Sequence, residues 1–351
     1  MIRVTPRAET SRGFAAAVPV AAALIALALA AIPLALAGAP IIEAYVQMAI
    51  GVFGSLFSFT EMLTRATPLI LTGLAAAVAF RARLWNIGGE GQFYLGAMAA
   101  VWIGTGMIDG PPALMIPLVL LAGAAAGGAG MLFPAILKTR FGADEVVTSL
   151  LLNFIILIFV QMMLEGPLKD PMGLGWPQSE PVIDAAILPQ LMDRMRLHAG
   201  FILALVTAMI AYVVMVFTVW GLKVRAVGEN PAAARHAGIG VNRTLLAVAF
   251  ASGALAGLAG VGEVAGLKGY LTADLSPGYG YAGIVVAMLA GLSPLGVVVA
   301  SIYVASVFVG ADSMSRAMGV SSFLADLTVS LSLICVLVGG FFARFRVAWQ
   351  R

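Results

Sequence analysis

The residues best suited to polar chemistry lie in a glycine-rich segment, residues 84–100, which reads LWNIGGEGQFYLGAMAA. Asn86, Glu90 and Gln92 alternate there with glycines, between two strongly apolar runs. Consecutive glycines continue a helix only at a cost in conformational entropy, and irregular backbone at membrane depth survives only where protein covers it or a cavity adjoins it. The pattern predicts a helix break at Gly-Gly-Glu-Gly. The polar side chains then either line a solute path or lie solvated in a connector between helices.

A second polar segment, FGADEVVTSLLLNFI, covers residues 141–155. Asp144 is a favourable N-cap, and Glu145 lies at the positive end of the following helix dipole. Asn153 lies about two turns further along an apolar helix. An amide at such a position either hydrogen-bonds to a neighbouring helix or faces a solute, and the first use is the more common one.

A third segment, residues 221–243, reads GLKVRAVGENPAAARHAGIGVNR. Asn230 can cap a helix, Pro231 suits its first turn, and Gly238 is a favourable stop, so the spacing predicts a helix of about two turns. One interpretation is a basic loop that touches anionic lipid. The other is a short, smooth helix that docks in the groove of a partner protein.

The composition places these segments in a membrane protein. Hydrophobic residues make up 61% of the 351 residues, charged residues only 11%, and the mean hydropathy is +1.02. No soluble fold of this size buries so much apolar surface, which excludes a cytoplasmic enzyme and a nucleic-acid binder. One cysteine and two histidines exclude a disulfide framework and argue against a metal site. The sequence contains no nucleotide-binding or hydrolase motif, so we expect no enzymatic activity and no cofactor of its own.

The gaps between charged residues predict about ten spanning helices, since one span needs roughly 20 apolar residues. We expect them near residues 14–37, 63–80, 92–107, 113–137, 146–165, 200–221, 244–264, 280–292, 295–310 and 324–342. Glu263 and Asp326 lie near the ends of these spans, where we expect them to be solvated. Glycines at helical spacing predict close packing faces; they are Gly123, Gly127, Gly128, Gly130, Gly253, Gly257 and Gly260.

The distribution of Lys and Arg predicts the orientation. With residues 44–60 outside the membrane core, 14 of the 20 basic residues fall on one side and 6 on the other, whereas a spanning 44–60 gives 9 against 11. The positive-inside rule favours the first arrangement. Both termini are then cytoplasmic, and residues 44–60 form an external interfacial or re-entrant helix. We expect one transmembrane domain over residues 1–351, with a cytoplasmic tail (1–12), an external loop (166–198) and a cytoplasmic loop (221–243).

Three segments, in this order along the chain, carry a family resemblance: LTGLAAAVAFRARLWNIGGEGQFYLGAMAA, FGADEVVTSLLLNFI and GLKVRAVGENPAAARHAGI. Together they resemble the permease subunits of bacterial ABC importers of the sugar and branched-chain amino-acid type. Within that group they are most similar to the nucleoside importers that use a basic-membrane-protein-type lipoprotein as receptor. The ribose-type branch carries a different Gly-Asp-rich sequence where NIGGEG stands here, which favours the nucleoside branch.

The resemblance implies an all-α, multi-pass protein of the bacterial inner membrane that moves nucleosides or related purine and pyrimidine compounds by alternating access. The implied partners are an ATPase with two nucleotide-binding modules, a second permease that is often a different chain, and an extracytoplasmic substrate-binding lipoprotein. ATP is then bound and hydrolysed on the partner. The implied substrate path contains Asn86, Glu90, Gln92 and Asn153. The implied coupling segment contains Gly228, Glu229, Asn230, Pro231, Ala232, Ala233, Ala234, Arg235 and Gly238.

Two alternatives remain open. A permease of the same family could carry a simple sugar or another small polar solute. An ion-coupled secondary transporter would need paired acids within the membrane or broken helices in both halves. The acids here lie mostly near helix ends, and the 221–243 loop would then lack a purpose. Dependence of transport on a co-expressed ATPase separates the two classes.

Overall fold

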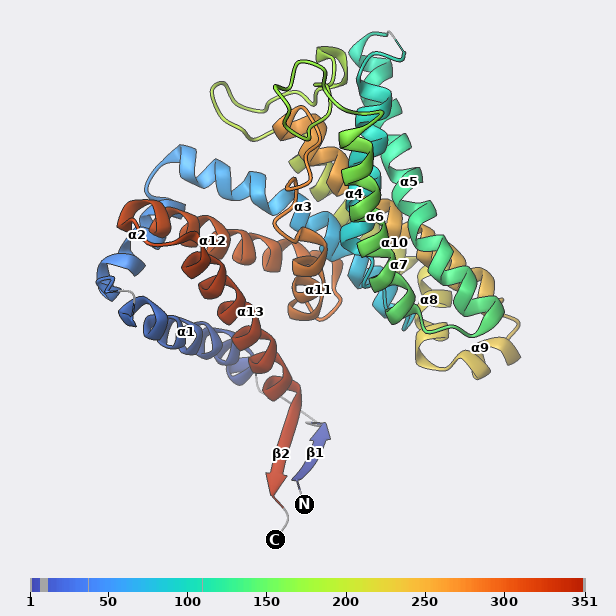
Figure 1. Ribbon diagram of the computed structural model, residues 1–351. Helices are drawn as coiled ribbons and strands as arrows, with labels where there is room; N and C mark the ends of the chain where they lie inside the picture. The colour runs from blue at the N-terminus through green and yellow to red at the C-terminus, as the bar shows by residue number, and fades with distance from the viewer. Residues whose placement is uncertain (1, 7–11, 37, 109, 350–351) are drawn as a thin grey trace. The chain divides into compact units, whose positions relative to one another are not determined.

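The computed structural model describes residues 2–6, 12–36, 38–108 and 110–349, which are largely helical (Figure 1). The α-helices are α1 (Arg12–Leu36), α2 (Ile41–Phe53), α3 (Leu56–Arg81), α4 (Gly89–Gly104), α5 (Pro112–Phe141), α6 (Glu145–Glu165), α7 (Gly200–Phe217), α8 (Val219–Glu229), α9 (Pro231–His236), α10 (Val241–Glu263), α11 (Tyr279–Leu289), α12 (Pro294–Met318) and α13 (Ser322–Arg344). A 3₁₀ turn, η1 (Asp184–Ala186), and a π-helical turn, η2 (Val264–Lys268), complete the helical elements, and β1 (Ile2–Pro6) pairs with β2 (Phe345–Trp349).

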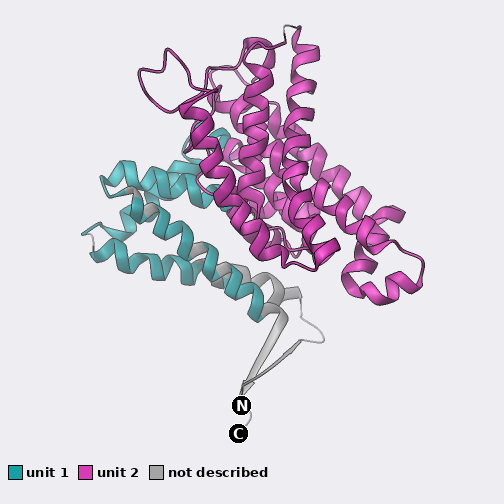
Figure 2. Cartoon of the chain, turned by 45° about the vertical axis from the view of Figure 1, so that its right-hand side comes forward, with its two compact units in different colours: residues 1–62, 302–351 teal, residues 63–301 magenta. Residues whose placement is uncertain are grey.

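The chain divides into two compact units (Figure 2). Unit 1 contains Met1–Met62 and Ile302–Arg351, and unit 2 contains Leu63–Ser301. In unit 1, α1 packs along α13, and β1 and β2 form an antiparallel pair at the ends of the described chain. The expectation of a single transmembrane domain stays a prediction, because this division describes only how the chain packs.

Unit 2 is built around α4, α5 and α10, which pack closely through their glycines. A Cβ on Gly127 would overlap the carbonyl oxygen of Gly253 and lie 2.7 Å from the Cα of Gly257. Backbone this close to backbone is typical of membrane helices packed through small residues. The predicted glycine faces on α5 and α10 are therefore confirmed.

Nine of the ten predicted spans each overlap one helix in the described residues, and the tenth, 200–221, is divided between α7 and α8. Six helices there are long and apolar enough to cross a membrane, and the number rises to seven if the bent pair α1–α2 is one span. The six are α3, α5, α6, α7, α10 continued through η2, and α12. Helices α4 and α11 are shorter than a full crossing requires. The mostly helical, multi-pass architecture is confirmed, the β1–β2 pair is the departure from the all-α expectation, and the crossing count of ten stays a prediction.

Three boundaries differ from the sequence expectations. Residues 44–60 do not form one helix: α2 ends at Phe53, and α3 begins at Leu56, well before the expected residue 63. The predicted span 200–221 is broken at Thr218, whose extended backbone (φ −107°, ψ 160°) ends α7 and caps α8. Glu263 is 3% exposed, so the expected solvated position is wrong. The reason is that η2 carries the helix past Glu263 instead of ending it there, whereas Asp326 is exposed as expected.

Candidate functional site

The polar site forms where α3 ends and α4 begins. Arg83 takes a left-handed conformation (φ 53°), and the amide of Leu84 donates to the Ala79 carbonyl at 3.1 Å, which closes α3. The chain then runs without helix to Gly88 and resumes at Gly89. The expected helix break is therefore present and includes Gly88, but Gly89, Glu90 and Gly91 already belong to the first turn of α4.

The physical reason lies in the position of these glycines within the helix. The first turn of a helix has backbone N–H groups without intrahelical partners, so Gly89 and Gly91 cost less there than in a helix interior. Because these glycines have no side chains, neighbouring groups can also approach their backbone closely. A Cβ on Gly91 would lie 2.9 Å from Oδ1 of Asn153, which is the atom that accepts the Gly91 amide at 2.8 Å.

Asn86 and Gln92 form a reciprocal amide pair across the start of α4. Nδ2 of Asn86 donates to Oε1 of Gln92 at 2.7 Å, and Nε2 of Gln92 donates back to Oδ1 of Asn86 at 2.8 Å. Asn86 also donates to Oγ of Ser252 on α10 at 2.9 Å, and Ser252 donates to the Ala75 carbonyl of α3 at 2.7 Å. The pair thus connects three helices through one continuous hydrogen-bond network.

Asn153 and Glu90 attach the same turn to two more helices. Nδ2 of Asn153, on α6, donates to the Ile87 carbonyl at 2.8 Å and to the Tyr281 hydroxyl at 3.2 Å. Oε2 of Glu90 accepts the amide of Gly280, at the start of α11, at 2.7 Å. The turn before α4 is therefore held from α6, α10 and α11 at once.

All four residues of the expected substrate path are buried, with exposed fractions of 3% for Asn86, 4% for Glu90, 1% for Gln92 and 0% for Asn153. The interpretation of this segment as a solvated connector is therefore wrong. The structure brings the four together around one turn, bound to protein groups. Their role toward a solute stays a prediction.

One turn further along α4, Tyr94 bonds to the stretch of chain that pairs with the loop of residues 166–199. Its hydroxyl donates to the Ala273 carbonyl at 2.7 Å and accepts the amide of Ser276 at 3.1 Å. The stretch 268–274 in turn pairs with the loop, since Ser179 and Leu271 exchange hydrogen bonds. A cavity of about 530 Å³ opens beside this contact; among its lining residues are Trp176, Gln178, Lys268, Tyr270 and Asp274.

His198 closes the loop of residues 166–199 just before α7. Its imidazole is 1% exposed, and Nδ1 accepts the amide of Gly200 at 3.2 Å. Burial lowers the pKa of His198 to about 4, so the ring is neutral at physiological pH. This residue therefore packs as an uncharged group.

The predicted short helix at residue 231 is confirmed as α9. Oδ1 of Asn230 accepts the amides of Ala232 and Ala233 at 3.0 and 3.1 Å, with Pro231 at the first helical position. The helix ends in a Schellman motif, in which the Ile239 amide donates to the Ala234 carbonyl and Gly238 takes φ +80°. The cap, the proline and the stop signal thus act as the sequence predicts.

Helix α9 exposes mostly small side chains on one face and packs against the rest of unit 2 on the other. Pro231, Ala232, Ala233 and Arg235 are exposed, whereas Ala234 is buried. At the end of α8, Gly228 packs on the end of α3: a Cβ there would overlap the Arg81 carbonyl oxygen and lie 3.2 Å from the Cα of Ala82. The segment before α9 therefore touches the turn that leads to Asn86.

Four partners of the site were not found from the sequence: Ser149, Ser252, Gly280 and Tyr281. Ser252 is the only polar residue of FASGALAGLAG, and that isolation was an available signal. Nothing in the sequence distinguishes Gly280 from the other glycines of the chain. Glu145 was expected only to complement a helix dipole; it is buried, forms an ion pair with Lys138 at 2.5 Å and accepts the Trp85 amide at 3.3 Å.

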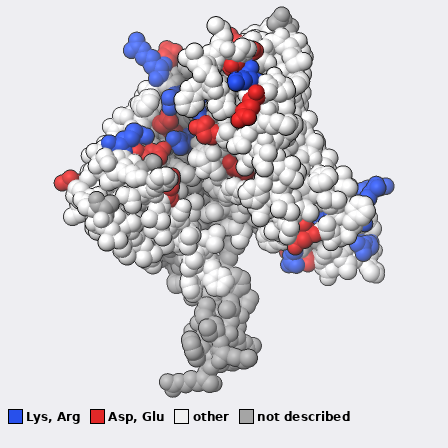
Figure 3. Space-filling view, viewed as in Figure 1, with Lys and Arg blue, Asp and Glu red and all other residues white. Residues whose placement is uncertain are grey.

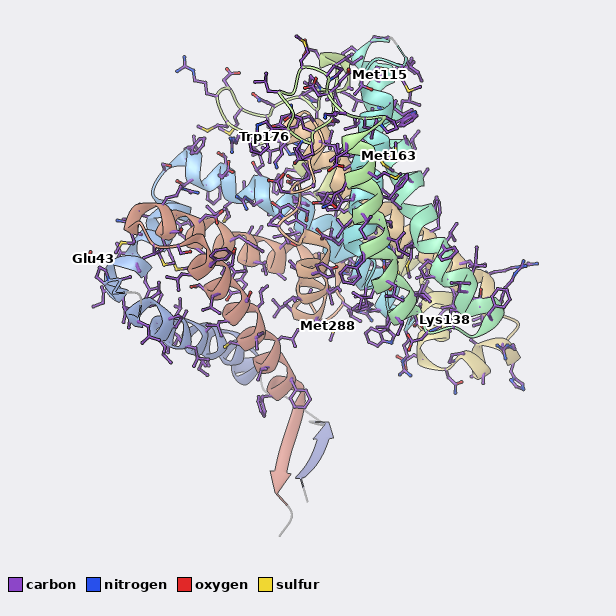
Figure 4. All side chains as sticks on the ribbon, viewed as in Figure 1. Glu43, Met115, Lys138, Met163, Trp176 and Met288 are labelled. Atoms are coloured by element: carbon purple, nitrogen blue, oxygen red, sulfur yellow. The ribbon has the colours of Figure 1, made fainter. Side chains whose placement is uncertain are left out.

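The two ends of unit 2 thus carry different features. Trp176 lies in the loop at one end, and Lys138 lies at the other, near α9 (Figure 4). Within the described residues, no group of three or more His, Cys, Asp or Glu side chains is placed to hold a metal ion.

Comparison with known proteins identifies the relatives of this chain. Residues 58–338 match the family model described as the permease component of the branched-chain amino acid transport system. A glucose ABC transporter permease protein of Haloferax volcanii is 35% identical over 99% of this chain and 93% of its own. A guanosine ABC transporter permease protein of Bacillus subtilis is 36% identical over 91% and 92%, respectively. A nucleoside ABC transporter permease protein of Lactococcus lactis subsp. cremoris is 33% identical over 78% of each chain. No solved structure matches significantly.

Proposed function

The chain belongs to the permease family of the branched-chain amino acid transport system, as the permease subunit of an ABC transporter, and from this premise we propose that it imports nucleosides or related purine and pyrimidine compounds. The observation that carries the substrate class is the pair of relatives named for guanosine and nucleosides, each above 30% identity over most of both chains. The NIGGEG segment points to the same branch.

A simple sugar is the second candidate, because the relative named for glucose covers 99% of this chain. Amide and carboxylate groups hydrogen-bond to sugar hydroxyls as readily as to nucleobases. The buried cluster around Asn86 is therefore compatible with either solute. Direct competition between the two solute classes decides between them.

The proposed transport mechanism is alternating access driven by a separate ATPase. We propose that α9 inserts its alanine face into a groove of the ATPase, with Arg235 at the rim. Movement of α9 passes through Gly228 to the end of α3 at Arg81, because these two backbones are in direct contact. From there it reaches the turn that carries Asn86.

In this proposal the cluster of Asn86, Glu90, Gln92 and Asn153 is a gate on the substrate path. Its polar groups are bound to one another and to the backbone, which is the arrangement expected of a closed gate. Opening exchanges those hydrogen bonds for bonds to the solute, so little hydrogen-bonding energy is lost. No residue of this chain acts as a catalyst, since the solute is not changed chemically.

The proposed arrangement in the inner membrane has ten crossings and both termini in the cytoplasm. The loop 221–243 then faces the ATPase, and the loop 166–198 faces the substrate-binding lipoprotein. The proposed second permease is a different chain. Cysteine labelling on a Cys335→Ser background tests the orientation: position 180 should react from outside, and position 230 only after permeabilisation. The reverse pattern would contradict both the orientation and the docking of α9.

The substrate proposal is tested by uptake into proteoliposomes that contain both permeases, the ATPase and the binding protein. Labelled guanosine uptake should require ATP, and excess unlabelled adenosine or uridine should reduce it, whereas excess glucose should not. ATP-dependent glucose uptake with no competition by nucleosides would overturn the nucleoside assignment. Uptake driven by an ion gradient without ATP would overturn the mechanism.

A further inference from the structure

A basic cavity of about 580 Å³ lies beside α9. Its cationic side chains come from three elements: Lys223 from α8, Arg235 from α9 and Arg243 from α10. The remaining wall is formed by the chain between Gly238 and Thr244, which links α9 to α10. Figure 3 shows Lys and Arg side chains at this end of unit 2, with Asp and Glu side chains beside some of them.

Among the described residues that line this cavity, none is acidic. Within the described part of the chain, no Asp or Glu forms an ion pair with Lys223, Arg235 or Arg243. Helix α10 adds its positive end, because its N-cap is Gly240, which offers no side-chain acceptor to the first amides of this 23-residue helix. Three cations and a helix N-terminus that converge on one concave site favour an oxyanion with several acceptor oxygens.

Apolar residues at the neighbouring junction of α7 and α8 indicate where that anion comes from. Phe217, Val219 and Leu222 are 71%, 68% and 56% exposed, and Leu222 directly precedes Lys223. These side chains belong to the end of α7, which is long and apolar enough to cross a membrane, and to the first turn of α8. In the proposed membrane arrangement they lie at the boundary between the apolar interior and the headgroups. A free phosphate needs no such apolar neighbours, whereas a lipid has acyl chains to place on them.

We propose that this cavity binds the phosphate headgroup of an anionic phospholipid. Lys223, Arg235 and Arg243 contact the phosphate oxygens, and the acyl chains lie along Phe217, Val219 and Leu222. The bound lipid fixes α8 and the start of α10 on either side of α9. Arg235 is shared with the proposed ATPase contact, whereas Lys223 and Arg243 are not, so variants of these two residues test the lipid site apart from the proposed docking.

The test uses the full chain, purified alone and titrated with phosphatidylglycerol or phosphatidylcholine while native mass spectrometry counts bound lipids. The wild type should prefer phosphatidylglycerol at least tenfold. One basic residue near a membrane surface contributes about a fivefold change in affinity, so the double variant Lys223→Gln/Arg243→Gln should weaken phosphatidylglycerol binding about 25-fold. Arg235 is kept because it belongs to the proposed ATPase contact.

Two further variants control for charge and folding. Arg140→Gln removes an exposed cation at the same end of unit 2 that does not line the cavity, and it should change phosphatidylglycerol affinity less than twofold. Arg243→Lys keeps the charge and should retain binding within threefold, while Arg243→Gln alone should lose about fivefold. An equal loss in Arg140→Gln would show a diffuse surface effect and overturn the site.

Other outcomes also overturn the proposal. Equal binding of phosphatidylglycerol and phosphatidylcholine would show that the cavity does not prefer an anionic headgroup. Displacement of phosphatidylglycerol by an equal concentration of inorganic phosphate assigns the cavity to a soluble anion instead of a lipid. If the double variant keeps its lipid but no longer co-purifies with the ATPase, Lys223 and Arg243 serve the partner protein.

Discussion

The contact between Gly228 and Arg81 yields the sharpest prediction, because it joins the proposed docking helix to the buried polar cluster. A methyl group added at Gly228 would overlap the Arg81 carbonyl oxygen and lie 3.0 Å from its carbonyl carbon. Both atoms belong to the backbone at the end of α3, so neither can rotate away. The substitution Gly228→Ala must therefore shift α8 relative to α3.

The size of the effect follows from the cost of overfilling a packed contact, about 1–3 kcal/mol. In a chain of this length, that cost lowers the melting temperature by roughly 1–4 °C. If the displacement falls on α8 and α9, the population able to dock correctly decreases about 5- to 150-fold. We expect ATP-driven uptake to fall within that range, while insertion in the membrane is retained.

Gly262→Ala is the matched control, since it makes the same chemical change on α10 with no atom within 4 Å of the new methyl group. Replacing a helical glycine by alanine there should leave stability unchanged or raise it by about 0.5–1 kcal/mol. Melting temperature and uptake are measured for both variants side by side. If Gly228→Ala behaves like Gly262→Ala, the contact between α8 and α3 does not transmit force, and the proposed route to the gate is refuted.

Three more predictions concern buried polar groups. Glu90→Gln keeps an oxygen for the Gly280 amide, so the protein should assemble normally while uptake falls at least tenfold; Glu90→Leu leaves that amide unpaired and should also lower stability by about 1–3 kcal/mol. A double-mutant cycle of Asn86→Ala and Gln92→Ala should give a coupling energy of about 0.6–2 kcal/mol, and additive effects would contradict the reciprocal pair. Burial lowers the pKa of His198 to about 4, so between pH 6.5 and 4 the unfolded chain binds a proton that the folded chain does not. As the pH falls through that window, the free energy of unfolding should decrease by up to about 3 kcal/mol and then level off. His198→Gln should remove this dependence of stability on pH.

The sequence predicted those features that depend on local chemistry. Asn230, Pro231 and Gly238 define α9 because a cap, a fixed φ and a left-handed stop act within a few residues. Helix positions followed from apolar run lengths, and glycine spacing predicted the packing of α5 on α10. Each of these signals needs no knowledge of distant parts of the chain.

The remaining features depend on contacts between distant residues. Gly280 and Ser252 complete the polar cluster from 190 and 166 residues away along the chain, and no local pattern marks them as partners of Glu90 and Asn86. The start of α4 lies three residues before the expected residue 92 for a related reason. Glycine penalties describe helix interiors, whereas here the glycines form a first turn that neighbouring backbone approaches closely.

The central claim is that α9 couples this chain to an ATPase, and one measurement tests it most directly. Ala233 is exposed on α9, so Ala233→Trp adds bulk at the proposed interface without disturbing the interior. Met172 is 87% exposed in the 166–198 loop, so Met172→Trp adds the same side chain at the opposite end of unit 2. Co-purification of the ATPase and solute-stimulated ATP hydrolysis should both fall at least tenfold in Ala233→Trp and stay at the wild-type level in Met172→Trp. Equal ATPase recovery and equal hydrolysis in both variants would contradict the account.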